Sequence, residues 1–185
     1  FKVDMQTPKV TVIEVFDAKL KEYRMIDDVA MSAATYILDM RYTKSLREDE
    51  GGTYGASTFG ELSILPKPEA ILQIYFDTKP AAADKLVSLS LEGLNTLASD
   101  GPTAEEFDMA VKNLKKNIPE SRISNEYWMN ALRFARTYGI DYDKEYENCV
   151  NNLKPEDISN ILKEVLASNI AKTVIMRPAA AAEAE

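Results

Sequence analysis

A cation and a phenol flank a glycine turn in the segment 46–55, which is the part of the sequence best suited to hold a ligand. Arg47 carries a planar guanidinium whose donors fit a carboxylate or several carbonyl oxygens. Tyr54 adds a hydroxyl on a rigid ring. Gly51 and Gly52 let the backbone turn sharply between the two side chains. These residue types at this spacing predict a grip on a peptide backbone.

The flanking patterns predict which elements position this segment. Apolar residues recur at helical spacing from about Asp27 to Glu48, which predicts a long helix with one buried stripe and Arg47 near its end. Alternating patterns over Thr53–Leu65 and Glu69–Asp77 predict two strands, with Tyr54 at the start of the first. A short proline-containing connection joins them, so we expect an antiparallel hairpin.

The rest of the chain adds more helices and two further strands. In chain order we predict a strand at Pro8–Phe16, helices from Pro80 to Ser99, Thr103 to Pro119, Ser124 to Gly139, over 142–153 and from Pro155, and a last strand at Lys172–Met176. This order predicts an α+β fold, a two-layer sandwich with helices on one face of a mostly antiparallel sheet. Residues 1–178 are expected to form one domain, followed by a low-complexity tail at 179–185.

Composition excludes several kinds of active site. The 185 residues, 45% of them apolar, suit one domain with a sizeable core. The chain has no histidine and one cysteine, Cys149, so it cannot assemble a His-based zinc site or a Ser-His or Cys-His nucleophile. The acidic clusters 27–28, 48–50 and 141–143 lack calcium-loop spacing and are interpreted as solvated charge. We therefore predict no catalytic residue and no metal ligand in this chain.

Charge and hydropathy bear on the partners. The net charge is −8, with 30 acidic and 22 basic residues, and the basic residues are dispersed along the chain. Nucleic acid is therefore not an expected partner. No apolar run approaches the roughly 20 residues needed to cross a bilayer, so no membrane span is expected.

The sequence Leu-Arg-Glu, then Gly, then Tyr-Gly around Arg47 and Tyr54 resembles the Arg/Tyr motif of a known family. It is similar to the C-terminal, non-catalytic domains of the pitrilysin/insulinase-type (M16) zinc metallopeptidases. The segments Thr103–Phe107 and Tyr127–Trp128 look like the same family, and the resemblance runs from about Val10 to Pro178. It implies the same α+β architecture, with Arg47 and Tyr54 binding a peptide substrate on a loop supported by the two glycines.

The resemblance also implies a division of labour. Zinc, its histidine ligands and the motif His-x-x-Glu-His would belong to a catalytic M16 domain, on the same longer chain or on a partner subunit. This chain alone would then be inactive. One alternative is a structural or assembly subunit that keeps the fold as a docking surface, and another is a peptide-binding module that acts alone. The motif favours the substrate-binding domain, because a scaffold has no evident need for Arg47 and Tyr54.

Other interpretations of individual residues remain open at this stage. Arg47 could simply be a cation at a helix C-terminus, or could pair with the carboxylates at 48–50. Trp128 is expected to pack in the core, and Cys149 to be a small buried apolar residue. If Gly52 lets substrate approach closely, Gly52→Val should lower activity more than stability.

Overall fold

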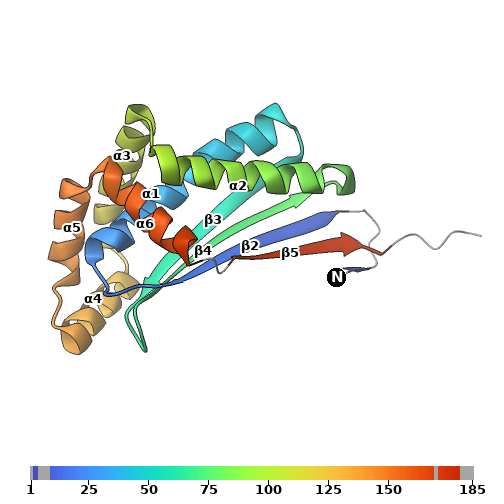
Figure 1. The fold of residues 1–185 in the computed structure, drawn as a ribbon. Coiled ribbons are helices and arrows are strands. Elements are labelled where there is room, and N and C mark those ends of the chain that lie inside the picture. The colour runs from blue at the N-terminus through green and yellow to red at the C-terminus, as the bar shows by residue number, and fades with distance from the viewer. Residues whose placement is uncertain (1, 4–8, 169–170, 180–185) are drawn as a thin grey trace, which may run out of the picture.

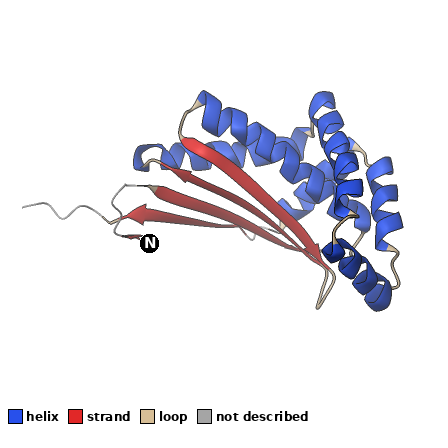
Figure 2. Ribbon diagram, turned by 180° about the vertical axis from the view of Figure 1, so that it is seen from behind, coloured by secondary structure: helices blue, strands red, loops and turns tan. Residues whose placement is uncertain are grey.

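The computed structural model describes residues 2–3, 9–168 and 171–179, and in these ranges the chain forms a sheet with helices on one face (Figures 1 and 2). The sheet has the strand order β1-β5-β2-β4-β3. All neighbouring strands are antiparallel except β1 and β5. The strands are β1 (Lys2–Val3), β2 (Val10–Lys19), β3 (Thr53–Ser63), β4 (Glu69–Thr78) and β5 (Ala171–Pro178).

This arrangement confirms the predicted α+β sandwich and its central hairpin, β3 and β4. It also places the early and late strands in the same sheet as the hairpin. The start of the predicted first strand, Pro8, and the tail beyond residue 179 lie outside the described residues.

The helical layer begins with α1 and ends with α6, and Figure 1 shows α3, α4 and α5 gathered beyond one end of the sheet. Most predicted helices are present with ends shifted by a few residues. The exception is the first, which changes from α-helix to π-helix before the glycine turn. The elements are α1 (Met25–Tyr42), the π-helix η1 (Thr43–Asp49), the 3-10 helix η2 (Pro80–Ala82), α2 (Ala83–Asp100), α3 (Ala104–Ser121), α4 (Asn125–Tyr138), α5 (Tyr142–Asn152) and α6 (Pro155–Ala167).

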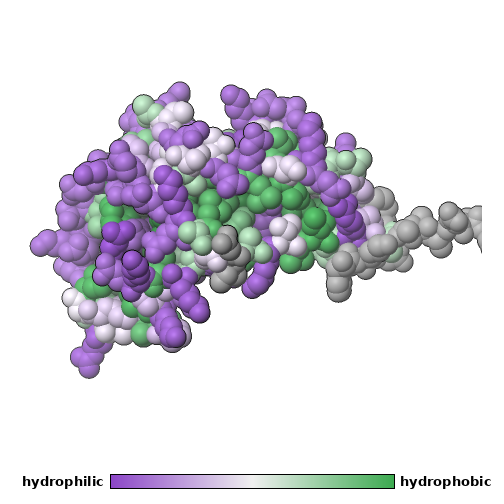
Figure 3. All heavy atoms as spheres, in the orientation of Figure 1, coloured by the Kyte–Doolittle hydropathy of each residue, from purple (hydrophilic) through white to green (hydrophobic). Residues whose placement is uncertain are grey.

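The core lies between the sheet and the helices, as the period of two along β2 and β4 dictates. Figure 3 shows apolar side chains as a green band between α2 and the strands, with hydrophilic ones over the helices around it. Helix α1 buries more than the single stripe predicted from its sequence, because it packs against β3 and also against α3, α5 and α6. Its fully buried residues include Val29, Ala30, Met31, Ala33, Ala34, Ile37, Leu38 and Tyr42.

One buried position in this core carries a carboxyl group. Glu14 lies on the helix-facing side of β2 and is 0% exposed. Its Oε2 is 2.7 Å from the hydroxyl of Ser90 in α2, and its Oε1 has no hydrogen-bond partner in the described part of the chain. Burial raises the pKa of Glu14 to about 7, although the Ser90 hydrogen bond acts in the opposite direction.

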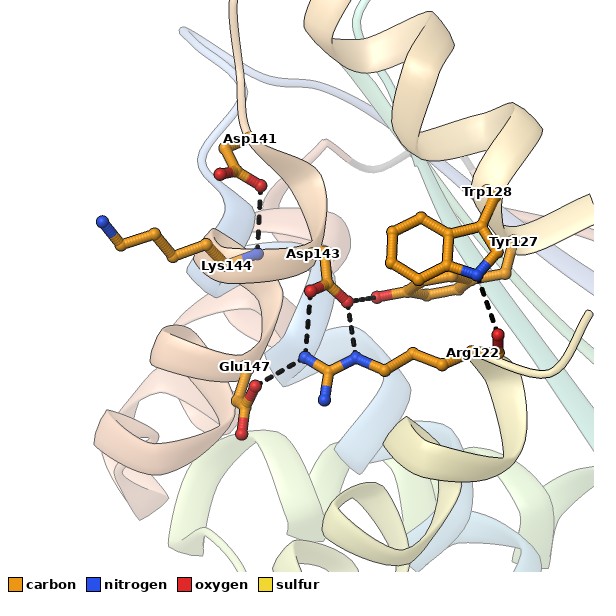
Figure 4. Close-up of polar contacts among 7 residues, drawn as sticks. All are labelled: Arg122, Tyr127, Trp128, Asp141, Asp143, Lys144 and Glu147. Atoms are coloured by element: carbon orange, nitrogen blue, oxygen red, sulfur yellow. Dashed lines mark hydrogen bonds and ion pairs between the residues drawn. The ribbon is translucent and has the colours of Figure 1, made fainter.

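Helix α4 corrects the prediction that Trp128 packs in the core. Trp128 is 44% exposed, and Leu132 on the same helix is 64% exposed. The helix lies against α5 at the end of the molecule, and Phe134 is its one buried side chain among the described residues. The indole Nε1 of Trp128 donates to the backbone oxygen of Arg122 at 2.8 Å (Figure 4), so the ring caps a polar corner.

Charged hydrogen bonds hold this corner of the fold together. Arg122, which follows α3, donates two hydrogen bonds to Asp143 at 2.7 and 3.0 Å and one to Glu147 at 2.6 Å (Figure 4). Tyr127 donates to the same carboxylate of Asp143 at 2.6 Å. Because both carboxylates belong to α5, these hydrogen bonds tie the end of α3 and the start of α4 to α5. Ring contacts of Tyr142 with Tyr127 and Phe134 add to them. Nearby, Cys149 is only partly buried, and burial raises the pKa of its thiol.

Candidate functional site

The glycine turn follows the segment in which the first helix changes from α-helical to π-helical geometry. After Tyr42 the chain adopts π-helical geometry through η1, a form that is often found at functional sites. Leu46 in this segment is fully buried, whereas the next residue, Arg47, is exposed. The backbone N–H of Gly51 donates to the oxygen of Arg47 at 3.1 Å, and that of Gly52 to Leu46 at 3.2 Å. With a φ of +57° at Gly51, the turn therefore starts directly on the turn of helix that carries Arg47.

Tyr54 sits on a β-bulge at the start of β3. Thr53 pairs with Thr78, but the next paired residue is Ala56, opposite Phe76, so Tyr54 and Gly55 together face one residue of β4. The hydroxyl of Thr53 donates to the oxygen of Gly55 at 2.8 Å and lies 3.1 Å from its N–H. Bulges re-aim side chains beside functional sites. Here the side chain of Tyr54 is 97% exposed.

The guanidinium of Arg47 has no ion-pair or hydrogen-bond partner in the described ranges of the chain. The acidic run beside it does not neutralise it. Glu50, the last carboxylate of that run, instead forms an ion pair with Lys85 of α2. The exposed cation therefore keeps its donors available for a ligand.

A cavity of about 560 Å³ adjoins Tyr54 at this end of the sheet. Arg47 is not among its lining residues. The structure thus brings Tyr54, Gly51 and Gly52 together around a cavity and places Arg47 just before them, joined through the backbone of Gly51. The cavity is lined by Lys9, Gly51, Gly52, Thr53, Tyr54, Asp77, Thr78 and Lys79.

Asp77 is the carboxylate of this cavity, and it is already engaged. It accepts hydrogen bonds from Lys9 at 2.8 Å, from Tyr75 at 3.2 Å and from the hydroxyl of Thr11. Burial acts to raise the pKa of Asp77, but the hydrogen bonds from Lys9 and Thr11 outweigh it and hold the pKa below its usual range. The same contact with Asp77 raises the pKa of the Lys9 ammonium.

Sequence reasoning missed Lys9, Asp77 and Lys79 as neighbours of Tyr54. They come from separate segments of the chain and follow no motif. The register of β2 and β4, in which Val10 pairs with Thr78, is what brings them together. The available signal in the sequence was that these charged residues lie at the ends of predicted strands. That signal points to a shared site only when the strand order is known.

Gly52 has a packing role that the sequence did not reveal. A Cβ atom at this position would lie 2.8 Å from Cδ1 of Leu86, which is fully buried. We therefore expect Gly52→Val to lower the free energy of unfolding by about 1–3 kcal/mol, as overpacking does. Urea denaturation would measure it. Gly55→Val is the matched control, because a Cβ there meets nothing within 4 Å. Equal stability of the two variants would contradict the packing role.

The described part of the chain holds no group of three or more cysteine or acidic side chains placed to bind a metal ion. None of its helices is both long and apolar enough to cross a bilayer.

Solved structures share this fold at low sequence identity. The periplasmic protease PqqL from Escherichia coli is 17% identical with a TM-score of 0.81, covering 97% of this chain and 20% of that one. A peptidase M16 inactive domain from Pseudomonas fluorescens is 18% identical with a TM-score of 0.77, covering 99% of this chain and 44% of that one. A protease from Helicobacter pylori is 17% identical with a TM-score of 0.71, covering 95% and 43%. This chain therefore spans less than half the length of each of these three.

Sequence comparison gives the family directly. No curated protein matches the chain significantly. The sequence profile described as "Peptidase M16 inactive domain" matches residues 5–114. That range is more than half of the 185 residues and includes β2, α1, the glycine turn and the hairpin. The chain therefore belongs to the family of peptidase M16 inactive domains.

Proposed function

We propose that this chain is the non-catalytic, substrate-binding domain of a zinc-dependent peptidase and completes a peptide-binding chamber with a separate catalytic domain. The observation that carries the proposal is the presentation of Tyr54, 97% exposed on a bulge that the Thr53 hydroxyl holds in place. A bulge of this kind aims its side chain outward beside functional sites, so the ring and hydroxyl of Tyr54 are presented to a ligand or a partner.

In this proposal Arg47 and Tyr54 donate hydrogen bonds to carbonyl oxygens of the peptide beside the bond that is cleaved. Donors that are fixed before the reaction stabilise the charge that develops on such an oxygen. They also orient the peptide. Gly51 and Gly52 support the loop, and residues 1–178 act as one domain with the tail at 179–185.

The catalytic chemistry is assigned to another domain, because this chain has no histidine with which to build the His-x-x-Glu-His motif. That domain would hold the zinc ion, which polarises the peptide carbonyl and activates water. It would lie on the same longer chain or on a partner subunit. The Pseudomonas and Helicobacter chains are more than twice as long as the region they share with this one, which supports the presence of further domains.

The proposal is tested by replacing the two donors in the complete parent peptidase. Arg47→Ala and Tyr54→Phe are each expected to lower kcat/KM for a peptide substrate by about a hundredfold, the loss typical of one transition-state donor. Lys44→Ala, which removes another exposed cation of η1, is the matched control and should keep full activity. Zinc content is measured in every variant.

Two results would overturn the proposal. If both variants keep full kcat/KM with zinc bound, the pair has no substrate role, and the assembly-subunit alternative becomes the better account. If the 185-residue chain alone cleaves peptide and a chelator blocks it, the division of labour is wrong.

A further inference from the structure

The cavity beside Tyr54 has a size and a position suited to part of a bound peptide. Its volume of about 560 Å³ falls within the range of small-ligand sites. It is framed by the glycine turn, by the end of β4 and by the residue that precedes β2. A hydrogen bond of 2.6 Å from the Thr78 hydroxyl to the oxygen of Gly52 ties the first two walls together. The cavity is therefore built into the fold.

Two of its three charged side chains neutralise each other. Lys9 and Asp77 form an ion pair with a distance of 2.8 Å. The third, Lys79, is exposed and has no ion-pair or hydrogen-bond partner for its ammonium group in the described part of the chain. With two lysines and one aspartate, the cavity has a formal charge of +1 in a chain whose net charge is −8.

The hydrogen bonds of the cavity lining also favour an anionic ligand. The carboxylate of Asp77 already accepts from three donors, and the oxygen of Gly52 accepts from Thr78. Among the described residues, the side-chain donor groups of the lining that have no partner are the ammonium of Lys79 and the hydroxyl of Tyr54. A lining with unused donors and a positive charge complements an anionic acceptor.

We propose that this cavity binds a carboxylate of the peptide substrate and that Lys79 is the cation that selects it. The inference rests on the proposed function, since it makes the peptide held by Arg47 and Tyr54 the source of the carboxylate. That carboxylate is an Asp or Glu side chain near the cleaved bond or the C-terminal carboxylate of the peptide. Enclosure of the cavity by the catalytic domain would strengthen the attraction by excluding water.

The experiment measures kcat/KM of the parent peptidase on matched peptides. One set carries Glu, Gln or Lys at each position flanking the cleaved bond, and a second set has a free or an amidated C-terminus. The wild-type protein is expected to prefer the carboxylate over its neutral amide by about tenfold at one position or at the C-terminus, as a charged hydrogen bond would produce. The set that shows the preference identifies the source.

Variants of Lys79 decide whether this residue is the selector. In Lys79→Gln the preference should fall to about one, because the amide peptide keeps its rate while the acidic peptide loses its advantage. Lys79→Arg should retain the preference. Lys67→Gln, at the distant turn between β3 and β4, is the matched control and should behave as wild type.

The outcomes separate this inference from the proposed function. Loss of activity toward all peptides in Arg47→Ala, with no carboxylate preference in the wild type, overturns the inference alone. A preference that survives in Lys79→Gln also overturns it. Full activity of Arg47→Ala and Tyr54→Phe overturns the proposed function, whatever the preference.

Discussion

Tyr42→Ala is expected to lower the free energy of unfolding of this chain by about 3–5 kcal/mol, the loss typical of removing a large buried ring. Tyr42 is 0% exposed at the end of α1, and its hydroxyl donates to the backbone oxygen of Ser90 at 2.8 Å. The ring lies so close to Gly93 that a Cβ atom there would be 2.9 Å from its Cε1. Helix α2 is thus shaped to receive this side chain.

Tyr42→Phe measures the contribution of the hydroxyl to stability separately from that of the ring. It keeps the packing and removes one hydrogen bond to a buried oxygen, so a loss of about 1–2 kcal/mol is expected. Urea denaturation of both variants gives the comparison. Equal losses in the two variants would show that the hydroxyl dominates, and a loss below about 1 kcal/mol in Tyr42→Ala would show that α2 closes over the gap.

The candidate site depends on this contact, because η1, which carries Arg47, follows Tyr42 directly. Tyr42 and Leu46 are the buried side chains that anchor the start and middle of the π-helical segment. A variant that loosens α1 from α2 therefore releases Arg47 as well. Under the proposed function, Tyr42→Ala should therefore weaken peptide binding although Tyr42 itself is buried.

The second large effect concerns pH and Glu14. Because burial raises the pKa of Glu14 from its ordinary 4.5 to about 7, the folded chain holds a proton there that the unfolded chain releases above pH 4.5. The contribution of this group to stability is full below pH 4.5, declines as pH rises and levels off above pH 7. Over that window the loss amounts to up to about 3 kcal/mol, at 1.36 kcal/mol for each unit of pKa difference.

Burial outweighs the hydrogen bond from Ser90, which lowers the pKa of Glu14 when it is ionised, and the protonated form can also satisfy the contacts around it. The hydroxyl of Ser90 lies 2.7 Å from Oε2 of Glu14 and 2.8 Å from the backbone oxygen of Val87, but it has a single proton. A protonated Glu14 can donate to Ser90 while Ser90 donates to Val87, so both contacts become hydrogen bonds. Tyr42 is the titratable neighbour whose charge couples to Glu14, and burial raises its pKa, so it stays neutral here.

Glu14→Gln tests this directly, because the amide has the shape of the protonated acid and does not titrate. The stability of the variant relative to wild type should rise by up to about 3 kcal/mol between pH 4 and pH 8. Urea denaturation at a series of pH values measures the difference, in which the titration of all other groups cancels. A difference that stays constant with pH would mean that Glu14 has the same pKa in the folded and in the unfolded chain.

The repeating patterns of the sequence were sufficient for the fold. The β-branched run in β2, the alternation in β4, the capping box at Thr103 and Glu106, and the helical spacing elsewhere each depend on neighbours within a few residues. Trp128 was placed wrongly because its helix is covered by one neighbouring helix, which local spacing does not encode. The extensive burial of α1 was missed for the converse reason, since β3 and the helices α2, α3, α5 and α6 all pack against it.

Some features of the candidate site were predictable from local sequence, and others depend on tertiary structure. Arg47, Tyr54 and the glycine turn could be placed at a helix-to-strand junction from the sequence, although their binding role stays a prediction. The bulge that exposes Tyr54 depends on the register of β3 against β4. The pairing of Lys9 with Asp77 spans 68 residues and requires the complete strand order. Contacts at that separation come from tertiary structure and leave no local pattern.

The strand order has a practical consequence for labelling. Both β1 and the end of β5 lie at the same end of the sheet as Thr53, since Thr11 pairs with Met176 and Val10 and Thr53 both pair with Thr78. The end of β5 is three strands from the start of β3, about 14 Å at the usual strand spacing. A fluorophore attached just after Pro178 would therefore sit close enough to Tyr54 to test whether a peptide binds there, and a bulky tag fused at that point would occupy space beside Tyr54.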